Sequence, residues 1–322
     1  MKIFNLTFEQ MLMMFTLILV GFIIRKKSNL PENTGSVMAK LETFIFVPAL
    51  SLFTQMTKCT VENFKDNWML MLYGLIVVAF AVVISYPLSK CFVRKNADLP
   101  ENSYQRNIYK YALTFGNYGF MGNFIILGVW GSDLFFKYSL FTFAVGILCH
   151  TWGLYILIPK DKNVSILDNF KKGILTPPTI ALVSGMLIGI LNITSYIPPF
   201  ILKALDNAGN CQGPVAMVLA GFVIGGYNLK EFIVNKKVYI VSLFRLIIIP
   251  AVMMLLLKLT GTSDEIMTLA LICFATPLGL NTIVYPAAYG GDTKTGAAMA
   301  VISHTLSVIT IPLMYLIFIV YL

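Results

Sequence analysis

Long apolar runs separated by short polar stretches make up most of the chain. Ten runs of about 20 residues are present, and each is long enough to cross a hydrocarbon core of about 30 Å. They cover roughly residues 6–24, 37–56, 68–90, 107–128, 134–158, 175–192, 200–226, 238–258, 266–289 and 295–320. The longest polar gaps are about twenty residues, so no soluble domain fits between the runs. The pattern predicts an all-α polytopic membrane protein with ten transmembrane helices.

The composition agrees with this class. Of the 322 residues, 57% are hydrophobic and 12% are charged, whereas a soluble domain carries about 25% charged residues. The first run is followed by Arg25, Lys26 and Lys27 and lacks a small-residue cleavage site. We therefore interpret it as a retained helix and not as a signal peptide.

The net charge of +9 raises the question of a nucleic-acid partner. When the loops are assigned alternately to two sides, sixteen basic residues fall on one side and six on the other, with Lys40 and Arg245 inside runs. In membrane proteins the cytoplasmic loops carry the excess of Lys and Arg. The charge thus predicts the topology, with both termini outside, and argues against nucleic acid. A patch that binds lipid head groups is the alternative.

Residue types that hold metals or catalyse reactions are scarce. The five cysteines are scattered without a C-x-x-C, so neither a zinc site nor a disulfide framework is indicated, and no cofactor is expected. The two histidines have no carboxylate nearby, and neither H-E-x-x-H nor G-x-S-x-G occurs. All fifteen acidic residues lie in loops or near run ends, with Glu42 and Asp206 the deepest. These observations argue against an intramembrane enzyme and against sodium–proton exchange on a buried aspartate.

The two halves of the chain contain similar strings. ILCHTWGLYILIP at 147–159 resembles VISHTLSVITIP at 301–312, and ALTFGNYGFMGN at 112–123 resembles ALICFATPLGLN at 270–281. Pro48 and Pro214 form a looser third pair. All three offsets are close to half of the chain. They predict two repeats, residues 1–160 and 161–322, of five helices each.

Five crossings are an odd number, so the second repeat enters the membrane from the opposite side. Inverted repeats of this kind build many secondary transporters, whose substrates bind near the midplane between interrupted helices. The fourth run is interrupted by Gly116, Gly119 and Gly122, and the ninth by Pro277 and Gly279. We expect the two breaks to cross and their half-helix N-termini to attract an anion. Glycines that only permit close helix packing are the alternative.

Several motifs resemble those of the auxin efflux carrier family, which includes bacterial organic-acid permeases and the plant PIN exporters. GNYGFMGN is similar to the fourth-helix motif of the family, and ILVGFIIRKK with FIFVPALSLF to its first two helices. CQGPVAMVLAGFVIGG resembles the seventh helix, and ATPLGLNTIVYPAAYGGD with ISHTLSVITIPL resembles the ninth and tenth. The resemblance covers essentially the whole chain.

The resemblance implies two inverted five-helix repeats with crossed, broken helices four and nine. Helices one, two, six and seven would form a scaffold that often forms a homodimer, and the others a transport domain that moves in an elevator-like manner. Organic anions such as malate, malonate or indole-3-acetate would be the substrates. Carried over by motif, Asn117 and Gly119 lie at the crossing in helix four, and Pro277 and Asn281 in helix nine. A plasma membrane location is expected, and a bacterial inner membrane suits so compact a chain.

One position departs from the family pattern. Relatives continue the helix-four motif as G-I-P, whereas this chain has Gly122, Asn123 and Phe124. We therefore expect the kink to come from glycines alone or to lie a residue or two away. The additional asparagine would change the choice of substrate.

Four amide or hydroxyl side chains at the two breaks are the first candidates for substrate contact: Asn117, Asn123, Thr276 and Asn281. A carboxylate needs several hydrogen-bond donors, and each asparagine amide supplies two. The alternative is that these side chains cap the half-helices themselves. Gly119 and Pro277 complete the predicted substrate site.

Three ionisable residues within the runs are candidates for coupling or gating. His150 and His304 occupy similar places in the two repeats, and an ordinary imidazole titrates near pH 6.5, which suits a proton-coupling group. Packing or an inter-helix hydrogen bond is the alternative for both. Arg245 is an intramembrane charge that suits a carboxylate, unless its side chain extends to the cytoplasmic surface. Coupling to H+, coupling to Na+ and downhill passage all stay open.

A carrier of a small organic anion is the leading interpretation of the sequence. The alternatives are a carrier of a neutral or steroid-like solute, as in the related bile-acid symporter fold, a channel, and a membrane sensor that keeps the fold without moving a substrate. Family members with sensory roles usually carry an added soluble domain, for which the 322 residues offer no segment.

Overall fold

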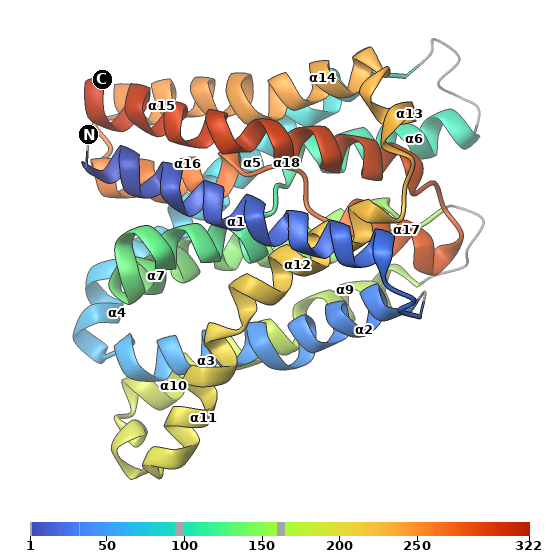
Figure 1. Cartoon of the computed structure of the whole chain (residues 1–322). Coiled ribbons are helices and arrows are strands. Elements are labelled where there is room, and N and C mark those ends of the chain that lie inside the picture. Colours follow the sequence, from blue (N-terminus) through green and yellow to red (C-terminus); the bar gives the residue numbers. More distant parts are fainter. Residues whose placement is uncertain (1, 32, 94–99, 160–164) are drawn as a thin grey trace.

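The computed structural model describes residues 2–31, 33–93, 100–159 and 165–322, and these residues form helices without any strand element (Figure 1). Within these ranges, seven helical stretches are long and apolar enough to cross a membrane: Ile3–Lys27, Thr34–Lys58, Val61–Cys91, Tyr118–Ile156, Pro199–Gly225, Lys236–Leu259 and Lys294–Tyr321. The predicted all-α multi-pass class is therefore confirmed. Four basic residues used for the topology, Arg94, Lys95, Lys160 and Lys162, lie outside the described residues.

The helices follow one another through short connections. In chain order the α-helices are α1 (Lys2–Lys27), α2 (Thr34–Leu41), α3 (Val47–Lys58), α4 (Val61–Asn67), α5 (Met69–Cys91), α6 (Pro100–Thr114), α7 (Asn123–Leu148), α8 (Leu154–Ile156), α9 (Ile166–Ile174), α10 (Pro177–Ile190), α11 (Pro199–Asn210), α12 (Gln212–Gly225), α13 (Leu229–Ile233), α14 (Lys236–Leu243), α15 (Ile249–Leu259), α16 (Asp264–Ala275), α17 (Asn281–Tyr289) and α18 (Lys294–Tyr315). A short 3₁₀ turn, η4 (Ile193–Tyr196), joins α10 to α11.

Three of the ten expected crossings do not form long continuous helices. The fourth run is divided, because α6 ends at Thr114 and helix resumes at Tyr118. The ninth run is divided between α16, which ends at Ala275, and α17, which begins at Asn281. The sixth run forms only the 14-residue apolar helix α10. The helix that resumes at Tyr118 runs on into the fifth run across a kink at Gly131, whose φ of 79° is a left-handed value that glycine adopts without strain. The ten-crossing arrangement stays a prediction.

Five helical segments among the described residues have π-helical hydrogen bonding: η1 (Glu42–Phe46), η2 (Tyr118–Gly122), η3 (Cys149–Gly153), η5 (Phe244–Ile248) and η6 (Leu316–Tyr321). Single π-turns are rare and often mark functional sites. Three of the membrane-embedded ionisable residues, Glu42, His150 and Arg245, lie on these segments. Three of the five π segments therefore coincide with ionisable residues in the membrane-spanning stretches.

Glu42 is deeper than the sequence indicated. It was expected near a run end, but it lies within the helical stretch Thr34–Lys58 and is fully buried. Neither carboxylate oxygen has a hydrogen-bond partner among the described residues. The segment η1 packs against α10, α11 and α12, so the carboxyl group is enclosed by helices instead of reaching an aqueous surface.

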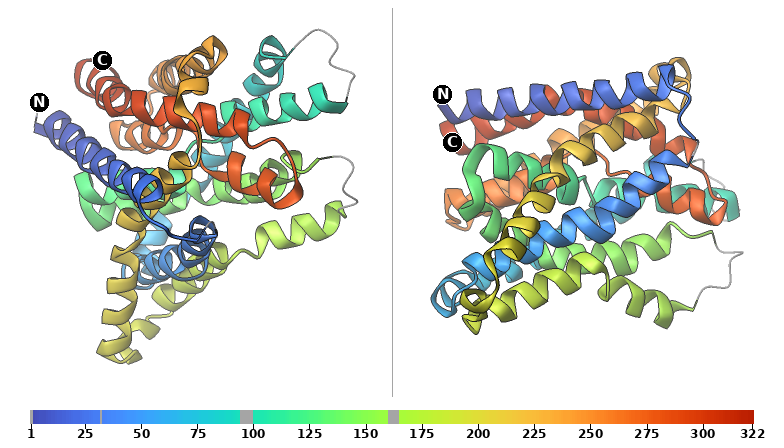
Figure 2. Two further views of the ribbon diagram at one scale, coloured as in Figure 1. Left: turned by 45° about the vertical axis from the view of Figure 1, so that its right-hand side comes forward. Right: turned by 60° about the horizontal axis from the view of Figure 1, so that its bottom comes forward.

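Small residues permit close helix packing where α1 meets α12. α1 and α12 lie along each other (Figures 1 and 2). A Cβ atom on Gly21 would lie 2.0 Å from the carbonyl oxygen of Val218, and one on Gly221 would lie 1.8 Å from that of Ile18. The two glycines thus let the backbones touch, which is how helices associate when no hydrophobic driving force acts between them in lipid.

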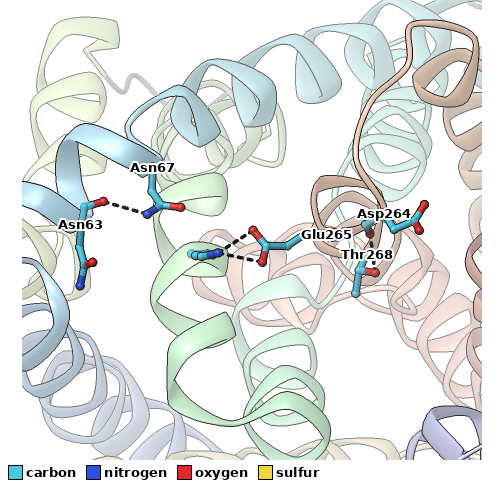
Figure 3. Close-up of polar contacts among 6 residues, drawn as sticks. Asn63, Asn67, Asp264, Glu265 and Thr268 are labelled. Carbon is cyan, nitrogen blue, oxygen red and sulfur yellow. Dashed lines mark hydrogen bonds and ion pairs between the residues drawn. The ribbon is translucent and has the colours of Figure 1, made fainter.

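Two ion pairs are found among the described residues, and each has one partner on α7. Lys137 contacts both carboxylate oxygens of Glu265 at 2.8 Å, at the first turn of α16 (Figure 3). Lys58, the last residue of α3, lies 2.6 Å from Asp133. In Figure 1 the chain termini lie at the left, whereas α2, α9, α13 and α17 lie toward the right. The molecule therefore has two distinct ends.

Candidate substrate site

The two helix breaks lie against each other. Gly116 in the first break and Leu278 in the second form an antiparallel bridge, and the backbone N–H of Asn117 donates to the carbonyl of Pro277 at 2.7 Å. Helix resumes directly after each break, at Tyr118 in η2 and at Asn281 in α17. Two helix N-termini thus begin beside one point of backbone contact.

A cavity of about 750 Å³ lies beside these helix starts. One wall comes from the two breaks, η2, α7, η3 and α17, and the other from α2, η1, α3 and α10. The cavity extends to Lys40 on α2, Lys172 on α9 and Tyr289 on α17, which belong to the end of the molecule opposite the termini (Figure 1). Small-molecule sites usually measure about 300–1,000 Å³, so the volume fits a ligand of that kind.

The cavity is electropositive. No carboxylate lines it among the described residues, whereas Lys40 and Lys172 do. The first N–H groups of a helix have no intrahelical partner and carry partial positive charge. A Cβ atom on Gly119 in η2 would meet no atom within 4 Å, so the backbone at this helix start faces open space. The site therefore offers main-chain donors and positive charge without an opposing acid.

Asn117 connects the cavity to a buried histidine. It lines the cavity, although only 4% of its surface is exposed. Its side-chain nitrogen lies 3.4 Å from Nε2 of His304, which is buried on α18. Nδ1 of His304 donates to the carbonyl of Ala300 at 2.8 Å. His304 does not line the cavity itself, so its contact with the site passes through Asn117.

Asn281 also lines the cavity, and part of its amide is already engaged. Its Nδ2 donates to the hydroxyl of Tyr111 at 2.8 Å, and that hydroxyl lies 3.1 Å from Sγ of Cys149. The same nitrogen also lies 4.0 Å from Sγ of Cys149, which is a second, weaker contact within the protein. The amide of Asn281 is therefore held at the cavity wall by Tyr111 and Cys149. Asn117 directly precedes the half-helix that begins at Tyr118, and Asn281 is the first residue of α17.

Asn123 and Gly119 both line the cavity, as expected for substrate contacts. The break itself lies earlier than the motif suggested. The helix is continuous through Gly122 and Asn123, and the interruption is at Phe115–Asn117. Of the three glycines in the motif, only Gly116 lies in the break, where its backbone passes between Arg245 and Thr276.

Thr276 and Pro277 do not line the cavity. Thr276 is fully buried, and its hydroxyl donates to the carbonyl of Cys273 at 3.1 Å, so it caps the C-terminal end of α16. Pro277 supplies the carbonyl that accepts from Asn117. The geometry of Thr276 thus fits a side chain that caps its own half-helix. Pro277 contributes the backbone hydrogen bond that joins the two breaks.

The two histidines stand in different relations to the cavity. His150 lines the cavity from η3, and its Nδ1 donates to the carbonyl of Gly146 at 2.8 Å. His304, by contrast, lies behind Asn117. Both imidazoles thus donate from Nδ1 to the carbonyl four residues earlier, and they differ in that only His150 lines the cavity.

Arg245 is buried and does not extend to the surface. Only 1% of it is exposed, and Nη1 donates to the carbonyls of Leu113 and Thr114 at 3.4 and 3.2 Å, at the end of α6. A helix C-terminus carries partial negative charge, which the guanidinium offsets. Nε and Nη2 have no hydrogen-bond partner among the described residues. A void of about 10 Å³ beside Arg245 is about the size of one water molecule.

A sequence profile of the membrane transport protein family matches residues 6–315. This chain belongs to that family, the auxin efflux carrier family. Uncharacterized transporter MJ1031 of Methanocaldococcus jannaschii is 24% identical and covers 95% of this chain and 96% of its own length. Uncharacterized transporter YfdV of Escherichia coli K12 is 22% identical and covers 94% of this chain and 95% of its own length. The expected family is confirmed, and it identifies a membrane transporter and not an enzyme.

In this auxin efflux carrier family member, the sequence pattern does not predict several residues of the cavity and of its surroundings. Lys40 was noted within a run but was given no role, although an intramembrane charge is by default a functional candidate. In the sequence, Lys172 contributes only to the excess of basic loop residues that predicts the topology. The contact between Tyr111 and Asn281 joins positions that are far apart in the chain, so no local pattern predicts it.

Proposed function

We propose that this family member is a secondary transporter of a small organic anion. The observation that carries the proposal is the joining of two helix N-termini at one cavity that contains two lysines and, among its described lining residues, no carboxylate. Helix starts bind carboxylates and phosphates through free N–H groups and the helix dipole. The amides of Asn117, Asn123 and Asn281 add side-chain donors for a carboxylate.

The mechanism that we propose is elevator-like alternating access. The two inverted repeats, 1–160 and 161–322, would supply ten crossings. The scaffold domain, with the homodimer interface, would consist of crossings one, two, six and seven. The transport domain would consist of the remaining crossings, which include the two interrupted helices. This division is supported by the position of the cavity, which has α3 and α10 on one side and the breaks, α7 and α17 on the other. Movement of one group of helices past the other would then carry the anion.

We further propose a plasma membrane location, in a bacterial inner membrane, with both termini outside. The cavity mouth contains Lys40 and Lys172 and lies at the end opposite the termini. Basic residues concentrate on cytoplasmic loops. The structure would then represent an inward-open state, in which the anion exchanges with the cytoplasm.

A carrier of a neutral or steroid-like solute is the second candidate. The volume of about 750 Å³ and the aromatic residues Phe44, Phe120 and Phe143 in the lining would accommodate a larger apolar ligand. Two lysines in the cavity lining and two helix starts, with no carboxylate among the described lining residues, favour an anion over a neutral solute.

The test is a competition assay with purified protein in liposomes. Radiolabelled malonate, malate and indole-3-acetate are offered separately, with unlabelled dicarboxylates, monocarboxylates, aromatic acids, bile acids and the matching neutral amides as competitors. We expect one acid to be taken up saturably and to be displaced by acids but not by their amides. Equal displacement by amides would overturn the anion proposal, and uptake of none of the acids would overturn the transport proposal as stated.

Asn117→Ala provides the matched variant in the same assay. Loss of two amide donors should raise the half-saturation concentration about tenfold, since a hydrogen bond to a charged group contributes about 1.5–3 kcal/mol. Thr276→Ser is the control, because Thr276 faces away from the cavity and a serine retains its capping hydroxyl. An unchanged half-saturation concentration in Asn117→Ala would remove this residue from the site.

A further inference from the structure

The contact between Asn117 and His304 fixes the protonation pattern of the imidazole. A backbone carbonyl only accepts hydrogen bonds, so Nδ1 of His304, 2.8 Å from the carbonyl of Ala300, carries a hydrogen. In a neutral imidazole the other nitrogen is then an acceptor. The amide nitrogen of Asn117, 3.4 Å from Nε2, is the donor that matches it. This arrangement fits a neutral His304 that accepts one N–H of Asn117 at Nε2.

A proton on Nε2 would reverse this contact. Nε2 would become a donor, which an amide NH₂ group cannot accept, whereas the amide oxygen can. A half-turn of the Asn117 amide satisfies the protonated ring by bringing Oδ1 toward Nε2. Both amide hydrogens then leave the histidine and are available to the cavity that Asn117 lines. Protonation of His304 therefore converts a partly engaged amide into one that offers all its donors to a bound anion.

We propose that His304 is the proton-binding site of transport, and that one proton at Nε2 is carried together with the anion through the rotation of the Asn117 amide. This inference rests on the proposed function, and it adds the coupling ion. The step is a proton transfer: an N–H bond forms at the lone pair of Nε2 with a proton from the solution on loading, and the same bond breaks on release. His304 is a positioning residue here, because it acts on the anion through Asn117.

The charges around α18 explain why the proton and the anion bind together. The elements packed against α18 are α1, α6, α12, α13, α14, η5, α16, α17 and η6. Their described titratable or charged side chains are Glu9, Arg25, Lys26 and Lys27 on α1; Tyr104, Arg106, Tyr109, Lys110 and Tyr111 on α6; Lys230 and Glu231 on α13; Lys236, Lys237 and Tyr239 on α14; Arg245 on η5; Asp264, Glu265 and Cys273 on α16; Tyr285 and Tyr289 on α17; and Tyr321 on η6.

Of these groups, Arg245 is the one that is both formally charged and buried among the described residues. It lies behind Gly116, one residue from Asn117, and no carboxylate pairs with it in the described part of the chain. An imidazolium at His304 would place a second buried positive charge in this region, which is costly without a partner. A bound carboxylate supplies the missing negative charge. Binding of the two ions is therefore mutually favourable, and such coupling is reciprocal.

The experiment measures proton movement directly in proteoliposomes. A pH-sensitive dye is enclosed in the lumen, and malonate, malate and indole-3-acetate are added outside in turn, with protein-free liposomes as the control for passive entry of the undissociated acids. We expect the acid that is taken up to acidify the lumen in proportion to its uptake. Its half-saturation concentration should rise by up to tenfold per pH unit over the range in which the unloaded imidazole is neutral.

The His304→Gln variant separates coupling from transport. Glutamine keeps an amide that can bond to Asn117 but cannot take up a proton in this range. We expect anion uptake to continue, without lumen acidification and with little dependence on pH between about 5.5 and 7.5. Thr305→Ser is the control, because Thr305 follows His304 on α18, is exposed and retains its hydroxyl as serine, and this variant should retain proton movement.

The possible outcomes are distinct. Anion uptake without proton movement in the unmodified protein would overturn the inference and leave the proposed function intact, and a requirement for Na+ in place of protons would do the same. Proton movement that persists in His304→Gln would assign coupling elsewhere and also overturn it. Because the unmodified protein alone gives a decisive result, the inference is tested even if the variant fails to fold. Absence of any uptake would instead count against the proposed function.

Discussion

At the scale of single residues, a polar side chain near a helix break belongs to the site only if it faces the cavity. Asn117, Asn123 and Asn281 face the cavity, whereas Thr276 faces the end of its own half-helix. All four are polar residues close to a glycine or proline, and the sequence pattern treats them alike. They differ in the direction in which the backbone through each break points their side chains. That direction depends on the contact between Gly116 and Leu278, which the sequence does not specify.

Replacement of Arg245 tests whether its charge or its packing matters. Arg245→Met should change the free energy of unfolding by less than about 1 kcal/mol, because loss of the carbonyl contacts is offset by removal of an unpaired buried charge. The half-saturation concentration for the anion should rise about tenfold, since two unit charges about 10 Å apart interact by about 1–2 kcal/mol at an effective dielectric constant of about 20. Thermal melting and uptake kinetics measure the two effects. Arg245→Lys, which keeps the charge, is the control, and unchanged affinity in Arg245→Met would show that the charge does not reach the site.

At the scale of elements, the sequence predicts that the fourth and ninth helices are interrupted, but it does not predict the residues at which each helix stops. Glycine and proline at 116–122 and 277–279 indicate that neither segment is a plain helix. The structure confirms two breaks in contact, yet the first lies at Phe115–Asn117 and the helix continues through Gly122. Gly119 has open space around its Cα, whereas a Cβ on Gly122 would clash with the hydroxyl of Tyr138 and one on Gly116 with Arg245 and Thr276. Only tertiary contacts distinguish these glycines.

Gly116→Ala should destabilise the protein. The added Cβ would lie 2.1 Å from Nη2 of Arg245 and 2.7 Å from the backbone oxygen of Thr276. Overpacking of this kind costs on the order of 1–3 kcal/mol. Gly119→Ala is the matched control, because its Cβ would meet nothing within 4 Å. Thermal melting in detergent measures both, and an equal melting temperature for Gly116→Ala and the unmodified protein would contradict the packing of the breaks.

At the scale of the whole molecule, composition and run length were enough to predict a helical membrane protein. They could not predict where a cavity lies or which end is open, because both depend on how α2, α3 and α10 sit against α7 and α17. The cavity between these helices reaches one end of the molecule at Lys40 and Lys172. The opposite end carries the chain termini (Figure 2).

Cysteine labelling tests the direction in which the cavity opens. In a background with Cys91→Ser and Cys211→Ser, the remaining native cysteines are buried. Thr43→Cys, in the cavity lining, should react with a membrane-impermeant maleimide from the cytoplasmic face, and a bound anion should slow the reaction several-fold. Lys65→Cys on the exposed surface of α4 is the control and should react only from the other face. Labelling of both positions from one face would contradict the inward-open assignment.

The ion pair between Lys58 and Asp133 joins α3 to α7 at the end away from the lysine-lined mouth. The Asp133 side chain is 83% exposed, and surface ion pairs contribute about 0–1 kcal/mol. Thermal energy alone opens and closes such a contact on a fast timescale. Contact between α3 and α7 therefore does not depend on this ion pair alone, since Gln55 and Ser139 also join the two helices in a buried hydrogen bond. The barrier to opening at that end should accordingly respond only weakly to the ionic strength of the medium.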